Sequence, residues 1–202
     1  MMEEKLIVLK FGGKCLENVK GFEQAALWIA RRKQEFSQVV VVVSAMGSLT
    51  TQLLDLSKAV NPEPPKREVD MLISTGERMS MSLLAMALDR KGIKAKSLTG
   101  SQAGILTCDE HMSANILEIK PRRVLHDLNS QVVVIVAGFQ GVSLKGEITT
   151  LGKGGSDTTA VALGVSLKAE RVEFFKDVSG VCSEDPKKTP EIQCFSELSF
   201  EQ

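Results

Sequence analysis

Residues 39–47 read VVVVVSAMG, and this stretch decides the fold class. Its five consecutive valines are β-branched and apolar, and small residues follow them immediately. Such a run is typical of a strand buried on both faces, which occurs in parallel sheets covered by helices. Similar strand-like segments occupy residues 6–9, 132–136 and 171–175. We therefore expect an α/β fold with a mainly parallel central sheet.

Helical patterns separate these strands. Apolar residues recur at helical spacing over residues 19–30 and again over residues 71–88. Pro121 suits the first position of a third helix, because the N–H that proline lacks is not needed there. Residues 160–167 predict a fourth helix, and residues 93–97 predict one more short strand. This alternation indicates a layered α/β domain.

Length and charge narrow the class of protein. The chain has 202 residues, 25 basic and 25 acidic side chains and 43% hydrophobic residues. The balanced charge gives no reason to expect a nucleic-acid partner. The longest apolar run, residues 39–43, is too short to span a bilayer, and the N-terminus lacks the apolar length of a signal peptide. We expect one cytoplasmic domain with no membrane partner.

The cysteines and histidines do not suggest a metal site. They lie far apart, without any Cys-x-x-Cys pair: Cys15, Cys108, Cys182, Cys194, His111 and His126. Zinc sites and disulfide frameworks usually show closer spacing. We therefore expect reduced thiols and no structural metal.

Ligands of open α/β sheets collect at the carboxyl ends of the strands. The first such segment is LKFGGKC (9–15), where Lys10 precedes Gly12 and Gly13. Glycines let backbone N–H groups approach a phosphate closely, and a lysine supplies positive charge. The pattern alone fits a plain glycine turn equally well.

Two further segments carry polar groups in apolar surroundings. Ser44, Thr50 and Thr51 follow the valine run and either bind an oxygen of a ligand or cap a helix. Glu77, in STGERMS (74–80), lies in a stretch otherwise suited to burial. A buried carboxylate needs a partner, which is either a substrate ammonium or a base of the protein such as Arg78.

The segment LGKGGSDTTAVALGV (151–165) predicts an anion site at the start of a helix. Its polar part comprises Gly152, Lys153, Gly154, Gly155, Ser156 and Asp157. Glycine N–H groups and the helix dipole favour bound anions. We expect Ser156 or Asp157 to cap a helix that begins near Thr158. A purely structural cap would leave the glycines and the lysine unexplained.

The segment FFKDVSGVCSEDPKK (174–188) follows the strand at residues 171–175. It contains Lys176, Asp177 and Lys187. Loops in this position often hold a nucleotide, although a plain surface loop is an equal alternative.

Taken together, these segments resemble the amino-acid kinase family and, within it, the aspartokinases. The matching runs are KFGGKC, VVVVVSAMG, REVDMLISTGERMSMSLLAMAL, SLTGSQAGILT, VVVIVAGFQGVSLKGEITTLGKGGSDTTAVAL and KDVSGVCSEDPK. The resemblance implies a three-layer αβα sandwich that transfers the γ-phosphoryl group of Mg-ATP to the β-carboxylate of L-aspartate. It also implies the first step of the lysine, threonine and methionine pathway, and it leaves room for a homo-oligomer.

The resemblance also implies residue roles. Lys10 and Asp157 would be catalytic, with Asp157 orienting Lys10. Thr50, Glu77 and Lys153 would bind the substrate, Glu77 through its ammonium and Lys153 through its α-carboxylate. The nucleotide-binding residues would be Gly12, Gly13, Gly154, Gly155, Ser156, Lys176, Asp177 and Lys187. Mg²⁺ would be bound through the nucleotide phosphates, with no metal ligand from the protein.

Several positions depart from the family pattern. Lys14 and Cys15 replace two hydroxyl residues, and Lys153 stands where aspartokinases usually have an arginine. The chain also ends where the family normally continues, so we expect residues 1–202 to be a catalytic domain truncated at its C-terminal end, without ACT domains. Two alternatives stay open: a kinase of another small acid, and an inactive module that binds a nucleotide or an amino acid.

Overall fold

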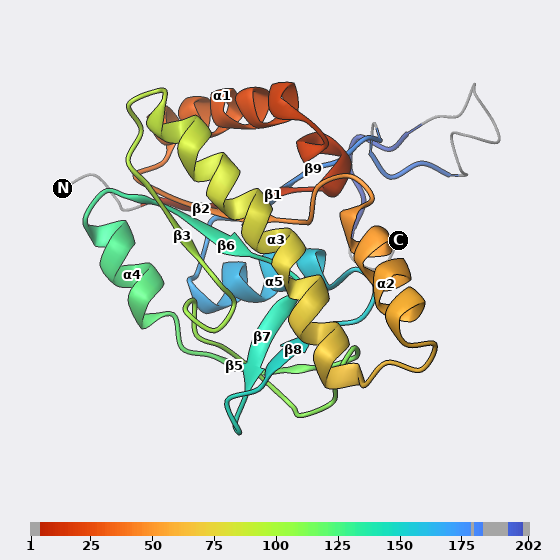
Figure 1. Cartoon of the computed structure of the whole chain (residues 1–202). Helices are drawn as coiled ribbons and strands as arrows, with labels where there is room; N and C mark the ends of the chain where they lie inside the picture. Colours follow the sequence, from red (N-terminus) through yellow and green to blue (C-terminus); the bar gives the residue numbers. More distant parts are fainter. Residues whose placement is uncertain (1–4, 179, 184–193, 200–202) are drawn as a thin grey trace.

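A five-stranded parallel sheet forms the centre of the protein (Figure 1). The computed structural model describes residues 5–178, 180–183 and 194–199. The strand order is β3-β6-β2-β1-β9, and each neighbouring pair is parallel. The strands are β1 (Leu6–Phe11), β2 (Gln38–Val43), β3 (Ala95–Leu98), β6 (Val133–Ala137) and β9 (Arg171–Phe175). The predicted parallel sheet is confirmed.

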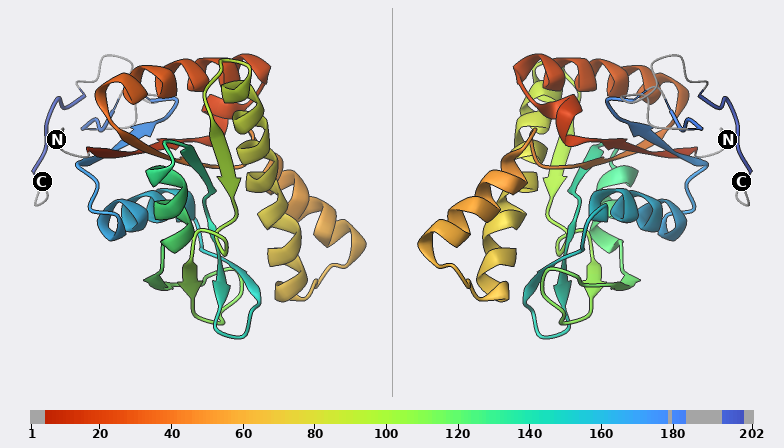
Figure 2. Two further views of the ribbon diagram at one scale, coloured as in Figure 1. Left: turned by 90° about the vertical axis from the view of Figure 1, so that its left-hand side faces the viewer. Right: turned by 90° about the vertical axis from the view of Figure 1, so that its right-hand side faces the viewer.

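Helices cover both faces of this sheet. They are α1 (Val19–Glu35), α2 (Leu49–Val60), α3 (Lys66–Asp89), α4 (Arg122–Asn129) and α5 (Gly155–Ser166), with a short 3₁₀ helix η1 (Gly13–Leu16). Figure 2 shows α1 and one end of α3 on one face, and α4 and α5 on the other. The chain therefore forms the expected three-layer αβα sandwich.

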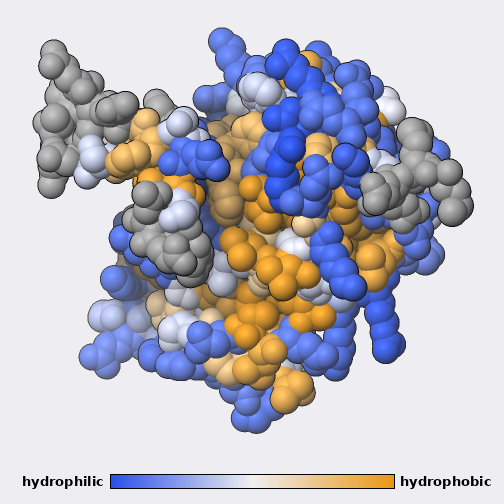
Figure 3. Space-filling view, turned by 180° about the vertical axis from the view of Figure 1, so that it is seen from behind, coloured by the Kyte–Doolittle hydropathy of each residue, from blue (hydrophilic) through white to orange (hydrophobic). Residues whose placement is uncertain are grey.

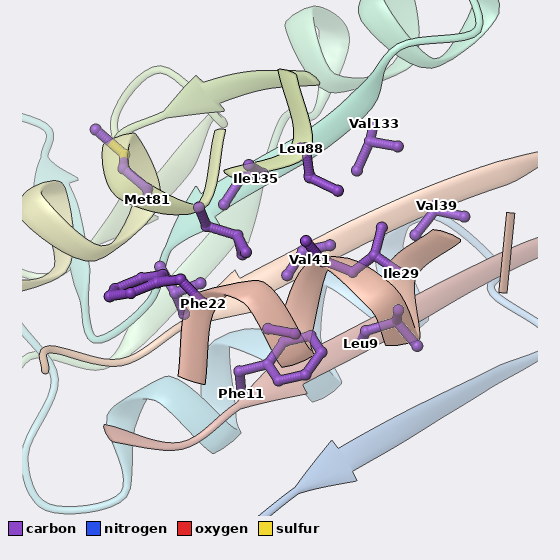
Figure 4. Packing of buried hydrophobic residues seen from close by; sticks show 14 of the residues in the cluster. Leu9, Phe11, Phe22, Ile29, Val39, Val41, Met81, Leu88, Val133 and Ile135 are labelled. Carbon is purple, nitrogen blue, oxygen red and sulfur yellow. The ribbon is translucent and has the colours of Figure 1, made fainter. Parts of the chain in front are cut away.

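Alternation along the strands divides the core into two halves. On one face, Leu9 and Val41 pack with Ile29 of α1 and Leu88 of α3 (Figure 4). On the other face, strand residues such as Val8 pack against α4 and α5. Because successive side chains of a strand point to opposite faces, Lys10 of β1 belongs to the face that α5 covers.

A second, smaller sheet lies beyond the carboxyl ends of the main strands, beside α2 and the start of α3 (Figure 2). Its order is β5-β4-β7-β8, in which β4 and β7 run parallel and the outer pairs are antiparallel. The strands are β4 (Ile105–Thr107), β5 (Ile116–Ile119), β7 (Gln140–Ser143) and β8 (Ile148–Thr150). The sequence pattern did not indicate this sheet, because its strands have three or four residues and mix polar with apolar side chains.

The start of α5 corrects one expectation. The helix begins at Gly155 rather than near Thr158, and its N-cap is Gly154, with φ +84°. No side chain caps this end, so neither Ser156 nor Asp157 has the predicted capping role. Glycine is suited to the N-cap here because only glycine adopts a positive φ without a steric penalty.

The expectation of reduced thiols is wrong for two cysteines. Cys182 and Cys194 form a disulfide, and the backbone forms an isolated antiparallel bridge at the same residues. Cys15 and Cys108 are free and half-buried. The two bonded cysteines lie twelve positions apart in the sequence, a spacing that gave no local signal of a disulfide.

The face of the molecule behind α3 carries exposed apolar residues (Figure 3). The exposed apolar side chains of the protein include Val161 and Val165 of α5 and Phe174 of the edge strand β9. These side chains belong to short elements. In the part of the chain that the structure describes, no helix has both the length and the apolar character that crossing a membrane requires.

Candidate active site

A cleft of about 450 Å³ opens at the carboxyl ends of β1 and β2. Helices α2 and α3 form one wall, and the segment from β8 to the first turn of α5 forms the other. Its lining includes the predicted residues Lys10, Gly13, Thr50, Glu77, Lys153, Gly154, Gly155, Ser156 and Asp157. Residues far apart in the sequence thus meet where ligands of α/β sheets usually bind.

Lys10 lies at the base of the cleft and is 5% exposed. Its Nζ lies 2.6 Å from Oδ1 of Asp157 in the first turn of α5. Lys176 donates a hydrogen bond of 2.7 Å to the other oxygen of the same carboxylate. Asp157 therefore holds two ammonium groups, one from β1 and one from the segment after β9.

The charge of Asp157 is maintained by these two lysines. Partial burial favours the neutral acid, but hydrogen bonds and charges from Lys10 and Lys176 outweigh it and hold the pKa of the Asp157 carboxyl below its usual value. An ionised Asp157 can orient Lys10 without taking its proton.

The glycine turn after β1 approaches the valine strand closely. A Cβ at Gly13 would lie 2.6 Å from the carbonyl oxygen of Ala45, so only glycine fits there. Gly13 lines the cleft, whereas Gly12 is not among the lining residues. The N–H of Gly12 donates to the carbonyl oxygen of Phe175 at 2.9 Å. A phosphate could receive that N–H only if this bond opened.

The loop before α5 uses part of its own hydrogen-bonding capacity. The N–H groups of Gly155 and Asp157 donate to the carbonyl oxygens of Gly152 and Gly154. The predicted cluster of converging N–H donors is therefore only partly available in this conformation. The remaining polarity towards the cleft comes from Ser156 and the exposed Lys153.

Glu77 is the most unusual group in the cleft. It comes from α3, is 2% exposed, and accepts a hydrogen bond of 3.1 Å from the N–H of Ala45 through Oε1. Its Oε2 is buried and has no hydrogen-bond partner among the described residues. Desolvation raises the pKa of Glu77 to about 7, against the smaller opposing effect of backbone hydrogen bonds.

The alternative partner for Glu77, Arg78, does not pair with it in the described structure. Adjacent helix residues point in different directions, so a carboxylate and its i+1 neighbour do not meet. Glu77 thus lines the cleft and has one buried oxygen without a hydrogen-bond partner among the described residues, and a ligand ammonium could supply that partner.

The cost of burying Glu77 predicts a measurable effect on stability. The folded protein holds the proton of Glu77 more tightly than the unfolded chain, so the free energy of unfolding falls as the pH rises from about 4.5 to about 7. We expect Glu77→Gln to be more stable than the wild type above pH 7, by at most about 3 kcal/mol, and equally stable below pH 4.5. Thermal unfolding of both proteins at pH 4 and pH 8 checks this. Equal melting temperatures at pH 8 would contradict a desolvated carboxylate.

The structure describes two of the three nucleotide-binding residues predicted near the C-terminal end. Asp177 forms an ion pair of 2.7 Å with Lys14, which ties the glycine turn to the segment after β9. Lys176 contacts Asp157 as described above. Lys187 lies outside the described residues. The departure at Lys14 therefore has a structural partner.

Several lining residues were not identified from the sequence. Leu54 and Ile73 come from α2 and α3, Thr150 from β8, and Met112 and Phe139 from loops. Thr150 directly precedes the glycine-rich segment at residues 151–165, and the glycines and charged residues of that segment gave the stronger indication of a site. Met112 and Phe139 both adopt positive φ, which no sequence pattern indicates.

Comparison with known proteins adds to this geometry. The model of the amino acid kinase family matches residues 5–202. The chain belongs to the amino acid kinase family.

The chain is similar to aspartokinases in particular. It is 49% identical to an aspartokinase of Corynebacterium efficiens over 198 residues, which cover 98% of this chain and 47% of the relative. The aspartate kinase structure from Synechocystis is 46% identical, with a TM-score of 0.80 over 93% of this chain and 31% of that one. The chain spans about half the length of the curated relatives it matches.

A more distant structure shows the same fold. Aspartokinase III of E. coli, in complex with aspartate and ADP, is 24% identical with a TM-score of 0.85, over 95% of this chain and 53% of that one. At this identity the likeness supports the three-layer architecture alone.

Proposed function

We propose that this amino acid kinase chain is the catalytic part of an aspartokinase, which transfers the γ-phosphoryl group of ATP to the β-carboxylate of L-aspartate. The observation that carries the proposal is the buried Glu77, whose Oε2 has no partner among the described residues. An α-ammonium group of an amino acid would supply the missing positive charge and hydrogen bond. The likeness to named aspartokinases supports the same acceptor.

Transfer would depend on Lys10 and Asp157. Phosphoryl transfer requires positive charge around the transferring group and accurate placement of donor and acceptor, rather than a covalent nucleophile. Lys10 is a buried ammonium at the base of the cleft, held by Asp157. Because the lysine is already oriented, it can stabilise charge on the transferring group without reorganisation.

The acceptor would lie between α3 and the loop before α5. Glu77 would bind the α-ammonium, Lys153 the α-carboxylate, and Thr50 a further oxygen of the acid. All three line the same cleft. The β-carboxylate would then face Lys10.

ATP would occupy the other part of the cleft. Gly12, Gly13, Gly154, Gly155 and Ser156 would contact phosphates, while Lys176, Asp177 and Lys187 would contact the nucleotide. Mg²⁺ would enter with the phosphates and supply charge neutralisation. The enzyme would act in the cytoplasm and catalyse the first step of the lysine, threonine and methionine pathway.

One observation favours a second candidate, a kinase of another small acid. Lys153 presents a single ammonium group, which cannot form the two parallel hydrogen bonds that an arginine gives to a carboxylate. An acid that needs only one contact at this position would suit the cleft equally well.

Trapping of the product with hydroxylamine tests the proposal. The chain is incubated with Mg-ATP and hydroxylamine, together with aspartate, glutamate, succinate or no acid, and the hydroxamate is measured. We expect an aspartate-dependent product. A product with another acid alone would favour the second candidate, and binding of ATP without any product would indicate an inactive binding module.

Replacing Lys153 tests its contact with the substrate. We expect Lys153→Arg to lower the aspartate KM by about fivefold, because a guanidinium gives the α-carboxylate a second charge-assisted hydrogen bond. Gly152 and Gly154 flank the position and leave room for the larger group. Steady-state kinetics at saturating ATP measure the effect, with Lys145→Arg on the β7–β8 turn as the control. A raised KM would contradict the assigned role.

A further inference from the structure

A buried carboxylate outside the proposed machinery joins the two walls of the cleft. Asp70 of α3 is fully buried and accepts a hydrogen bond of 2.5 Å from the hydroxyl of Thr150 at the end of β8. Its other oxygen lies 2.7 Å from Nδ1 of His111 in the loop between β4 and β5. Asp70 and Glu77 are seven residues apart, so they lie on the same face of α3.

The same carboxylate fixes the backbone of Met112. The N–H of Met112 donates to both oxygens of Asp70, at 3.1 and 3.2 Å. Met112 has φ +68°, a conformation that residues other than glycine rarely adopt. Such conformations persist where surrounding contacts over-determine them, and they cluster at functional sites.

Met112 lies beside the proposed site of the substrate α-carboxylate and is 36% exposed. Met112 lines the cleft together with Glu77 and Lys153. A side chain at Gly152, next to Lys153, would lie 3.9 Å from the carbonyl oxygen of Met112. The N–H of Ala114 also donates to the carbonyl oxygen of Thr150, which keeps this loop against the wall that carries Lys153.

We propose that Met112 is a specificity-determining residue that limits the length of the acid in the cleft, and that Asp70 is the positioning residue that holds it there. The proposal rests on the proposed function. A thioether at this place fills space beside the α-carboxylate site, so an acid one methylene longer than aspartate meets the Met112 side chain. Asp70 acts through the backbone of Met112 and through Thr150 and does not touch the acid.

Met112→Gly tests the proposal with a variant that we expect to fold. Glycine adopts positive φ freely, so Met112→Gly removes the side chain and relieves the backbone at once. Because one methylene changes discrimination by about tenfold or more, we expect the ratio of kcat/KM for aspartate to that for glutamate to fall about tenfold. The KM for ATP should not change.

Matched variants separate a specific role from a general one. Met112→Leu keeps the bulk and should keep the wild-type ratio. Asp70→Asn should move the ratio in the same direction as Met112→Gly, because an amide cannot accept all four contacts. Asp109→Asn is the control, since Asp109 lies on the same loop but pairs outwards with Lys145 at 2.9 Å.

The outcomes distinguish this proposal from the proposed function. An unchanged ratio in Met112→Gly overturns the role of Met112, even if the wild type is an active aspartokinase. If the wild type phosphorylates neither acid, the proposed function fails, and the ratio of the two dissociation constants, measured by calorimetry, replaces the kinetic ratio. Equal ratios in wild type and Met112→Gly would then overturn the present proposal, as would a wild type that binds neither acid.

Discussion

Replacement of Lys10 by methionine is expected to lower kcat by roughly a thousandfold, because it removes a preorganised positive charge from the transferring phosphoryl group. Methionine keeps the length of the apolar stem, so the packing between β1 and α5 should survive. Asp157 keeps its hydrogen bond to Lys176, and therefore no buried carboxylate is left without a partner. Steady-state turnover at saturating ATP and acid measures the effect.

Lys5, the residue immediately before β1, provides a matched control. It is exposed and pairs with Glu170 at 3.6 Å. Lys5→Met should retain wild-type turnover. Circular dichroism and melting curves show whether Lys10→Met is folded, and calorimetric binding of ATP shows whether the nucleotide affinity falls with turnover. Activity of Lys10→Met within tenfold of the wild type would remove Lys10 from the mechanism.

Glu77→Gln is expected to raise the aspartate KM by roughly thirtyfold or more, since a buried charge-assisted hydrogen bond contributes about 2 to 3 kcal/mol. The KM for ATP should stay near the wild-type value. In the wild type, protonation of Glu77 removes the charge that binds the ammonium, so the aspartate KM should rise as the pH falls through about 7. Glu77→Gln should lack this pH dependence.

Glu68→Gln is the control on the same helix, because Glu68 is exposed and pairs with Arg67. The aspartate KM and the melting temperature at pH 8 test two different properties of Glu77, its contact with the substrate and the cost of its burial. A variant that binds aspartate poorly but melts at a higher temperature has lost a functional group whose burial was costly. Equal effects on the KM for ATP and for aspartate would instead indicate a general distortion of the cleft.

The sequence predicted the main sheet well because its signal is local. Runs of valine and isoleucine mark strands that are buried on both faces, and the valine run at residues 39–43 lies in β2, which is buried throughout. The sequence also indicated that the polar residues after β1 and β2 and those of the glycine loop before α5 lie near one another. The carboxyl ends of parallel strands share one edge of the sheet, where ligands bind. The resemblance to aspartokinases implied that Asp157 orients Lys10, and the two side chains lie 2.6 Å apart.

Other features depend on contacts that no local pattern contains. The small sheet has strands too short for periodicity to show. Asp70 contacts His111, 41 positions later in the sequence, and Thr150, 80 positions later. Only the tertiary structure reveals that Met112 lies in the cleft. The first turn of α5 was misjudged for a similar reason, because Asp157 contacts two lysines instead of capping its own helix.

The claim that the cleft binds an amino acid through Glu77 is tested most directly by binding aspartate and succinate to the wild type and to Glu77→Gln. Succinate has the same two carboxylates and lacks the ammonium group. Isothermal titration calorimetry at pH 8 gives the four dissociation constants without requiring turnover. We expect the wild type to prefer aspartate by about thirtyfold and Glu77→Gln to lose this preference. Equal affinity of the wild type for both ligands, or an undiminished preference in Glu77→Gln, would contradict the claim.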